Sequence, residues 1–202
     1  MMIKICGITN LDDARAAVEN GATALGFNFF PASPRFVTAE DAGRVIAALP
    51  ATVCKVGVFV NVAPEKVAET ARALALDVAQ LHGDEPPAHF PAGMRVWKAV
   101  RVDAEFNPET LAALPVEAVL LDSGATGLYG GSGQTFDWSR ATGSKCKIVL
   151  AGGLDADNVA GAIEQARPWG VDACSRIEST PGKKDHAKMA AFLKAARRAS
   201  QS

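Results

Sequence analysis

Eight short apolar runs recur along the chain, and each is followed by a cluster of turn residues. After most of these clusters comes an Ala-rich segment with helical periodicity, so strands and helices are expected to alternate. The expected strands are Met2–Cys6, Ala24–Phe29, Cys54–Val60, Asp77–Leu81, Arg95–Val100, Ala118–Asp122, Lys147–Ala151 and Val171–Ser175. The expected helices are Asp12–Asn20, Ala39–Leu49, Pro64–Leu74, Pro108–Leu114, Asp157–Ala166 and Ala187–Arg198, with only weak helical signals after the fourth and sixth strands.

Polar residues precede most of the expected helices. Each has a side-chain oxygen that can accept a hydrogen bond from a free amide of the first helical turn. The predicted N-caps are Asn10, Thr38, Asn107, Asp155 and Asp185.

Eight strand–helix units in 202 residues leave no room for a second domain. Strands that are apolar on both faces suit a parallel sheet covered by helices. The sequence therefore predicts an α/β fold, a single (β/α)8 TIM barrel over residues 1–202. A doubly wound open sheet is the competing fold, but its G-x-G-x-x-G turn is absent after the first strand, where Cys6-Gly7-Ile8-Thr9 stands instead.

The composition argues for a small-molecule partner. Net charge is −1 and no basic run stands out, which disfavours nucleic acid and anionic membranes as partners. The four cysteines show no C-x-x-C spacing and are expected to be reduced thiols. The N-terminus has no signal-like apolar stretch, so we expect a cytoplasmic protein, and the absence of a long exposed apolar segment favours a monomer.

In a barrel of this kind, the active site lies at the C-terminal ends of the strands. The candidates found there are Cys6, Asn28, Arg35, Asn61, His82, Lys98, Arg101, Asp122, Gly152, Gly153, Asp172 and Ser175.

Several segments then resemble, in the right order, the signature segments of the phosphoribosylanthranilate isomerase family. They are Lys4–Thr9 (KICGIT), Phe29–Arg35 (FFPASPR), Gly57–Asn61 (GVFVN), Gln80–Glu85 (QLHGDE), Gly130–Gly133 (GGSG), Phe136–Trp138 (FDW), Ala151–Leu154 (AGGL) and Pro181–Asp185 (PGKKD). Each is weak alone, but together they span nearly the whole chain.

The resemblance implies an aldose–ketose isomerase of tryptophan biosynthesis that uses no metal or cofactor. It converts N-(5-phosphoribosyl)anthranilate, a sugar phosphate, into 1-(2-carboxyphenylamino)-1-deoxyribulose 5-phosphate by an Amadori rearrangement. A proton must reach the ribose ring oxygen and another must leave C2, so the site needs an acid and a base. The resemblance assigns the base to Cys6 and the acid to Asp122.

Both roles require a shifted pKa. A thiol with an ordinary pKa of about 8.5 is a poor base at neutral pH unless cations or amide dipoles stabilise the thiolate. Lys4 lies two residues away, on the same strand face, and is a candidate for that help. Asp122 must instead hold a proton, which needs a poorly solvated site or a nearby anion. Without the motifs, Cys6 would be taken as a small buried apolar residue and Asp122 as a turn residue.

The resemblance also implies substrate-binding residues. Arg35, otherwise an ordinary solvated loop arginine, would pair with the anthranilate carboxylate. Phosphate is expected between the loops after the seventh and eighth strands, held by amides of Gly152, Gly153, Ser175 and Arg176 and by a short helical turn. The role of His82 stays open, and Asp172 is expected to be structural.

Three positions depart from the family pattern. Cys174 and Arg176 stand where the family often has serine and glycine, and Ser132 stands where threonine is common. Because glycine adopts positive φ freely, the arginine puts the geometry of the last loop in question. We expect the Arg176 amide, rather than its guanidinium, to contact phosphate.

Two other functions compete with this interpretation. The histidine-pathway isomerase performs the same chemistry, but it places an aspartate at the first strand end, where this chain has Cys6. A catalytically inactive barrel that only binds a sugar phosphate, or a regulatory binding protein, would need neither Cys6 nor Asp122.

Overall fold

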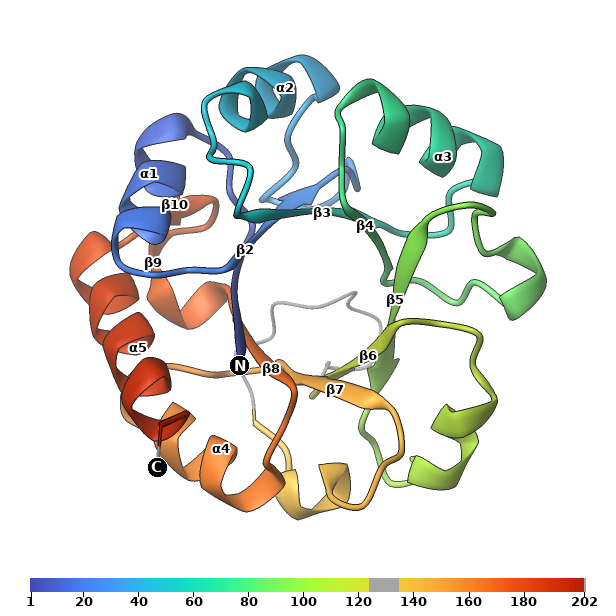
Figure 1. The fold of residues 1–202 in the computed structure, drawn as a ribbon, viewed down its shortest axis with the longest axis vertical. Coiled ribbons are helices and arrows are strands. Elements are labelled where there is room, and N and C mark those ends of the chain that lie inside the picture. The colour runs from blue at the N-terminus through green and yellow to red at the C-terminus, as the bar shows by residue number, and fades with distance from the viewer. Residues whose placement is uncertain (124–134, 202) are drawn as a thin grey trace.

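A computed structural model describes residues 1–123 and 135–201, which include eight parallel strands closed into a barrel (Figure 1). The strands are β1 (Met2–Cys6), β2 (Ala24–Asn28), β3 (Cys54–Phe59), β4 (Val78–Leu81), β5 (Arg95–Arg101), β6 (Ala118–Asp122), β7 (Lys147–Leu150) and β8 (Gly170–Ala173). Each pairs with the next in sequence, and β8 pairs with β1. The predicted (β/α)8 barrel is confirmed, with strand boundaries within two residues of those expected. The motif Gly130–Gly133 and the Ser132 departure lie outside the described residues.

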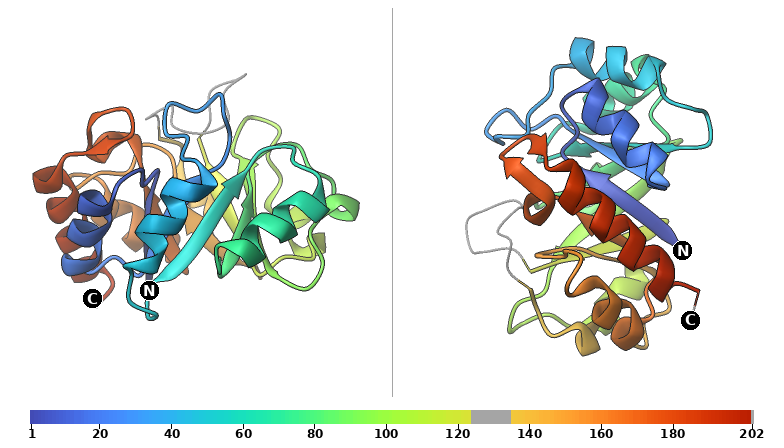
Figure 2. Two further views of the ribbon diagram at one scale, coloured as in Figure 1. Left: turned by 90° about the horizontal axis from the view of Figure 1, so that it is seen from above. Right: turned by 90° about the vertical axis from the view of Figure 1, so that its left-hand side faces the viewer.

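Helices surround the barrel on its outer side, as the view down the barrel and the two side views show (Figures 1 and 2). The α-helices are α1 (Leu11–Glu19), α2 (Ala39–Ala47), α3 (Pro64–Ala73), α4 (Val159–Ala166) and α5 (His186–Ala199). Short 3₁₀ helices occur at η1 (Pro87–His89), η2 (Pro108–Ala113), η3 (Trp138–Ala141) and η4 (Ser175–Ile177). A small hairpin of β9 (Glu178–Thr180) and β10 (Lys183–Lys184) precedes α5.

The expected helix Pro108–Leu114 is a 3₁₀ helix instead. Pro115 follows Leu114, and a residue before proline avoids the helical region. Leu114 is accordingly extended, with ψ 126°. Only six residues are left for the helix, too few for an α-helix to gain from propagation.

Four of the five predicted caps are confirmed. Asn10, Thr38, Asn107 and Asp185 each accept a hydrogen bond from a backbone amide at the start of the following helix. Asp155 was expected to cap the seventh helix, but α4 begins only at Val159. The Asp155 carboxylate accepts from the amides of Asp157 and Asn158, so it stabilises the turn before the helix.

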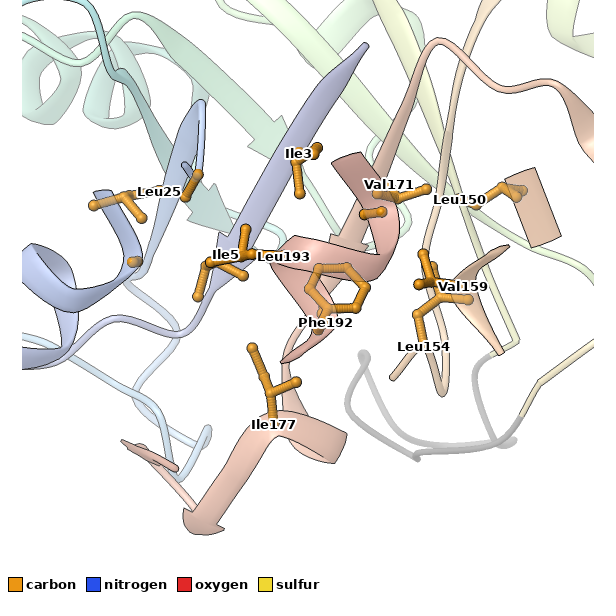
Figure 3. Packing of buried hydrophobic residues seen from close by; sticks show 14 of the residues in the cluster. Ile3, Ile5, Leu25, Leu150, Leu154, Val159, Val171, Ile177, Phe192 and Leu193 are labelled. Atoms are coloured by element: carbon orange, nitrogen blue, oxygen red, sulfur yellow. The ribbon is translucent and has the colours of Figure 1, made fainter. Parts of the chain in front are cut away.

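The strands divide their side chains between two layers. Ile3 and Ile5 of β1 pack outward in a buried cluster with Phe192 and Leu193 of α5 (Figure 3). Because neighbouring residues of a strand point to opposite faces, Lys4 and Cys6 point into the barrel. A second buried cluster contains side chains from at least five strands. It includes Val56, Val78, Trp97, Leu120 and Val149. Cys6 therefore stands at the open end of a packed interior.

Candidate active site

A cavity opens at the C-terminal ends of the strands. Its volume is about 140 Å³. All seven residues predicted as catalytic or substrate-binding line it: Cys6, Arg35, Asp122, Gly152, Gly153, Ser175 and Arg176.

Of the other strand-end candidates, Asn28, His82 and Asp172 also line the cavity, whereas Asn61, Lys98 and Arg101 do not. Lys98 is buried, and its ammonium contacts the Gly83 carbonyl at 2.6 Å and Glu85 at 3.1 Å. Asn61 accepts a hydrogen bond from the Asp84 amide. These two residues brace the turn after β4 and so lie away from the pocket.

Cys6, the last residue of β1, is nearly inaccessible to solvent, at 9%. Its pKa is well below that of an ordinary thiol. The largest cause is hydrogen bonding from the Cys174 thiol, and the ammonium groups of Lys4 and Lys184 lower the pKa further, against the opposing effect of burial. This environment favours a thiolate at the first strand end.

Lys4 is fully buried beside Cys6, on the face that the sequence predicted. Its ammonium lies 2.9 Å from the Asp172 carboxylate on the neighbouring strand β8. Burial alone would lower the Lys4 pKa, but the negative charges of Asp172 and Cys6 outweigh it and raise the pKa above its ordinary value. Lys4 is therefore a cation fixed next to the thiol.

Gly26 on β2 leaves the space that this pair occupies. A Cβ atom there would lie 2.9 Å from Cys6 Sγ and 3.0 Å from Lys4 Nζ. Any larger residue would therefore displace the thiol or the ammonium.

Asp122 ends β6 on another wall of the cavity and is 7% exposed. Its Oδ2 lies 3.5 Å from His82 Nε2. Its Oδ1 is buried and has no hydrogen-bond partner among the described residues. A buried carboxyl oxygen without a partner is costly in a folded protein, and such atoms are frequent at functional sites.

His82 is linked in turn to Gln80, whose Nε2 lies 3.0 Å from His82 Nδ1. With the amide nitrogen as donor, Nδ1 accepts and the imidazole proton resides on Nε2, facing Asp122. The motif Gln80–Glu85 thus supplies a histidine, held by Gln80, beside the carboxyl group.

Arg35 lines the cavity from the loop after β2 and forms a two-pronged ion pair with Glu178. Its Nε lies 3.0 Å from Oε1, and its Nη2 lies 2.8 Å from Oε2. Lys184 also contacts Glu178, at 2.9 Å. Although burial opposes it, hydrogen bonding from Arg35 and the charge of Lys184 lower the Glu178 pKa, so this carboxylate is charged. The arginine is consequently held in place before any ligand arrives.

Two glycines shape the side of the cavity next to β7. Gly152 and Gly153 have φ of +79° and +62°, which side chains rarely adopt. A Cβ at Gly152 would also lie 2.9 Å from Asp122 Oδ1. The expected helical turn after the eighth strand is present as η4. The Arg176 guanidinium, 48% exposed, lies 3.3 Å from the Asp155 carboxylate.

Several residues around the cavity had no role predicted from the sequence. Gln80 and Lys184 lie within quoted motifs but carried no separate signal, and Cys174 was visible only as a departure from the family pattern. In residues 1–123 and 135–201, no three His, Cys, Asp or Glu side chains converge as a metal site. In the same residues, no helix is long and apolar enough to cross a membrane.

Comparison with known proteins places this geometry in one family. Residues 3–195 match the family model described as N-(5'-phosphoribosyl)anthranilate isomerase. The N-(5'-phosphoribosyl)anthranilate isomerase of Solibacter usitatus is 56% identical, over 98% of each chain. The crystal structure of phosphoribosyl anthranilate isomerase from Thermotoga maritima is 42% identical, with a TM-score of 0.88 over 98% of this chain and 99% of that one. A further solved isomerase, 40% identical with a TM-score of 0.84 over 98% and 99% of the two chains, was crystallised with reduced 1-(o-carboxyphenylamino)-1-deoxyribulose 5-phosphate.

Proposed function

The chain belongs to the N-(5'-phosphoribosyl)anthranilate isomerase family, and we propose that it performs the family's reaction with Cys6 as general base and Asp122 as general acid. It is an isomerase of tryptophan biosynthesis, an intramolecular oxidoreductase of the aldose–ketose type. The observation that carries the proposed roles is that a stabilised thiolate and a partnerless carboxyl oxygen line the same cavity.

The substrate is N-(5-phosphoribosyl)anthranilate, and the product is 1-(2-carboxyphenylamino)-1-deoxyribulose 5-phosphate. In the first step, Asp122 protonates the ribose ring oxygen as the C1–O bond breaks, which leaves a protonated Schiff base. Oδ1 suits this role because it makes no hydrogen bond to the described protein and Gly152 has no side chain to crowd it. His82 holds the other oxygen through Nε2.

In the second step, the Cys6 thiolate removes the proton from C2, and the resulting enolamine tautomerises to the ketose. Lys4, Lys184 and the Cys174 thiol favour the thiolate before substrate binds. A base that is already ionised at neutral pH avoids the cost of first losing its own proton.

Two further sites hold the ends of the substrate. Arg35, fixed by Glu178, is proposed to pair with the anthranilate carboxylate. The amides of Gly152, Gly153, Ser175 and Arg176 are proposed to hold the phosphate, with the η4 turn beside them. The solved relative's complex with the reduced product analogue supports a ligand of this class.

A fluorescence assay that follows the loss of phosphoribosylanthranilate tests the function. We expect turnover by the wild-type protein, with kcat reduced about 10²–10⁴-fold in Cys6→Ala and in Asp122→Asn, the usual scale for a positioned acid or base. Circular dichroism and thermal unfolding must show an intact fold. A folded wild-type protein without turnover would favour a barrel that only binds sugar phosphates, and full activity in either variant would remove that residue from its role.

We further propose that the protein is a monomer. Among the residues that the structure describes, the only exposed large apolar side chains are Met1 and Phe36, at 42% and 40%. Two isolated side chains make no apolar patch of the size found at stable homodimer interfaces. Sedimentation equilibrium should give the mass of one chain, and a dimer mass would refute the proposal.

A further inference from the structure

Cys6 and Cys174 stand at the seam where the barrel closes. In the register of β1 and β8, Lys4 pairs with Asp172 and Ile5 pairs with Ala173. The residue that follows Ile5 is Cys6, and the residue that follows Ala173 is Cys174. Neighbouring strands lie about 4.8 Å apart, and the Cα atoms of a disulfide lie roughly 4.4–6.8 Å apart. The register therefore places Cys174, the residue directly after β8, beside Cys6 at the end of β1, where the gap between neighbouring strands suits a disulfide.

The side chains also share one space. Both cysteines line the cavity. The glycine Gly7 leaves room for Cys174, since a Cβ there would lie 3.1 Å from its Sγ, and Gly26 leaves room for Cys6 in the same way. Lys184 Nζ is 3.9 Å from Cys174 Sγ. Lys4 Nζ lies beside Gly26, as Cys6 Sγ does.

We propose that Cys6 and Cys174 form a peroxide-reactive dithiol, in which hydrogen peroxide oxidises Cys6 and Cys174 then closes a reversible disulfide across the active site. The activity consequence rests on the proposed role of Cys6 as the base, because a disulfide sulfur cannot accept a proton from C2. Formation of the bond does not depend on that role.

The chemistry balances in two steps. The Cys6 thiolate attacks one oxygen of the peroxide, the O–O bond breaks, and Cys6 becomes a sulfenic acid as hydroxide leaves and takes a proton from solvent. The Cys174 sulfur then attacks the Cys6 sulfur, and the hydroxyl leaves as water with the Cys174 proton. Two thiols lose two electrons in total, and the peroxide is reduced to two waters.

The surroundings suit these roles. Cys6 is the attacking sulfur because the Cys174 hydrogen bond and the two ammonium groups favour its thiolate. Cys174 keeps its proton, since hydrogen bonding to Cys6 and burial raise its pKa, and it is therefore the resolving thiol. Neither other cysteine fits: the pKa of Cys54 is raised to about 11, mainly by burial, and Cys146 donates to the Leu111 carbonyl.

Peptide mapping tests the bond without reference to turnover. The full-length protein is treated with hydrogen peroxide, its free thiols are blocked, and it is digested with trypsin under non-reducing conditions. We expect the peptide Ile5–Arg15 joined to Ile148–Arg176, at the summed mass less two hydrogen atoms. Dithiothreitol should separate the pair. Failure to find this linked pair in oxidised protein would overturn the proposal.

Two serine variants sharpen the test, and each is compared with its own untreated activity. In Cys174→Ser, Cys6 has no resolving thiol, so peroxide should carry it on to the sulfinic acid, with a gain of two oxygen atoms and no recovery in dithiothreitol. Cys54→Ser is the matched control and should form the linked pair and recover its activity as the wild type does.

If Cys174→Ser recovers its activity as fully as the wild type does, the proposed dithiol is wrong. If the linked pair forms while activity is unchanged, the dithiol stands and Cys6 is not the base.

Discussion

Nε2 of His82 lies 3.5 Å from Oδ2 of Asp122, while Oδ1 of the same carboxyl group has no partner among the described residues. One oxygen of the proposed acid is thus oriented by the protein, and the other is left for the substrate. Gln80 extends this arrangement, because its Nε2 lies 3.0 Å from His82 Nδ1. With the Gln80 amide as donor, the imidazole N–H is on Nε2, the nitrogen that faces Asp122.

His82 is therefore expected to act as a positioning residue. His82→Ala should lower kcat by about tenfold, as expected for loss of one polar contact with a carboxyl group, with little change in KM. His82→Gln, which retains an N–H, should recover part of the loss. His89→Ala, a change in the short η1 helix, is the control. A His82→Ala enzyme with normal kcat would show that Asp122 needs no such support.

The Cys174 thiol is expected to set the pH range of activity. Its hydrogen bond is the largest cause of the lowered Cys6 pKa, so the thiolate persists to lower pH than an ordinary thiol would allow. The acidic limb of kcat/KM against pH should therefore move to higher pH in Cys174→Ala and stay close to the wild type in Cys174→Ser, which keeps a donor. The pH dependence of Cys6 alkylation should shift in parallel. An unmoved limb in Cys174→Ala would assign the low pKa to the lysines instead.

Arg35 should be coupled to the substrate's carboxylate. Arg35→Ala should raise KM for the natural substrate but cost little further with an analogue that lacks the carboxylate, which is a double-mutant cycle with the ligand as one partner. Glu178→Gln should weaken binding in the same direction, because it loosens the guanidinium. If the effects of Arg35→Ala and of removing the carboxylate on KM were simply additive, the two groups would not be in contact.

Backbone amides, not the Arg176 side chain, are expected to hold phosphate. The Arg176 guanidinium already contacts Asp155. Inorganic phosphate or a product analogue should therefore bind much more weakly to Gly153→Asp, which places a carboxylate in the site, and only slightly more weakly to Arg176→Ala. Isothermal titration calorimetry gives both affinities. A greater loss in Arg176→Ala would indicate a side-chain clamp.

Much of this protein could be predicted from local sequence, because strand faces and strand ends depend on neighbouring residues. The two-residue alternation placed Lys4 beside Cys6, and the order of strands and turns placed Cys6, Asp122 and Gly152 at one end of a barrel. The helix after the fifth strand was also predicted to within one residue, but its type was wrong, because Pro115 keeps Leu114 out of the helical conformation.

The pairings that make the site functional were decided by the tertiary structure. Lys4 meets Asp172 across 168 residues, and Arg35 meets Glu178 across 143, because closing the barrel brings β8 against β1. Cys174 reaches Cys6 through the same closure, and His82 reaches Asp122 from a different strand. A pKa depends on burial and on charges within a few ångströms in space. The sequence by itself could therefore name Cys6 and Asp122 as candidates, but only the folded chain brings Cys174 and Lys184 to Cys6 and His82 to Asp122.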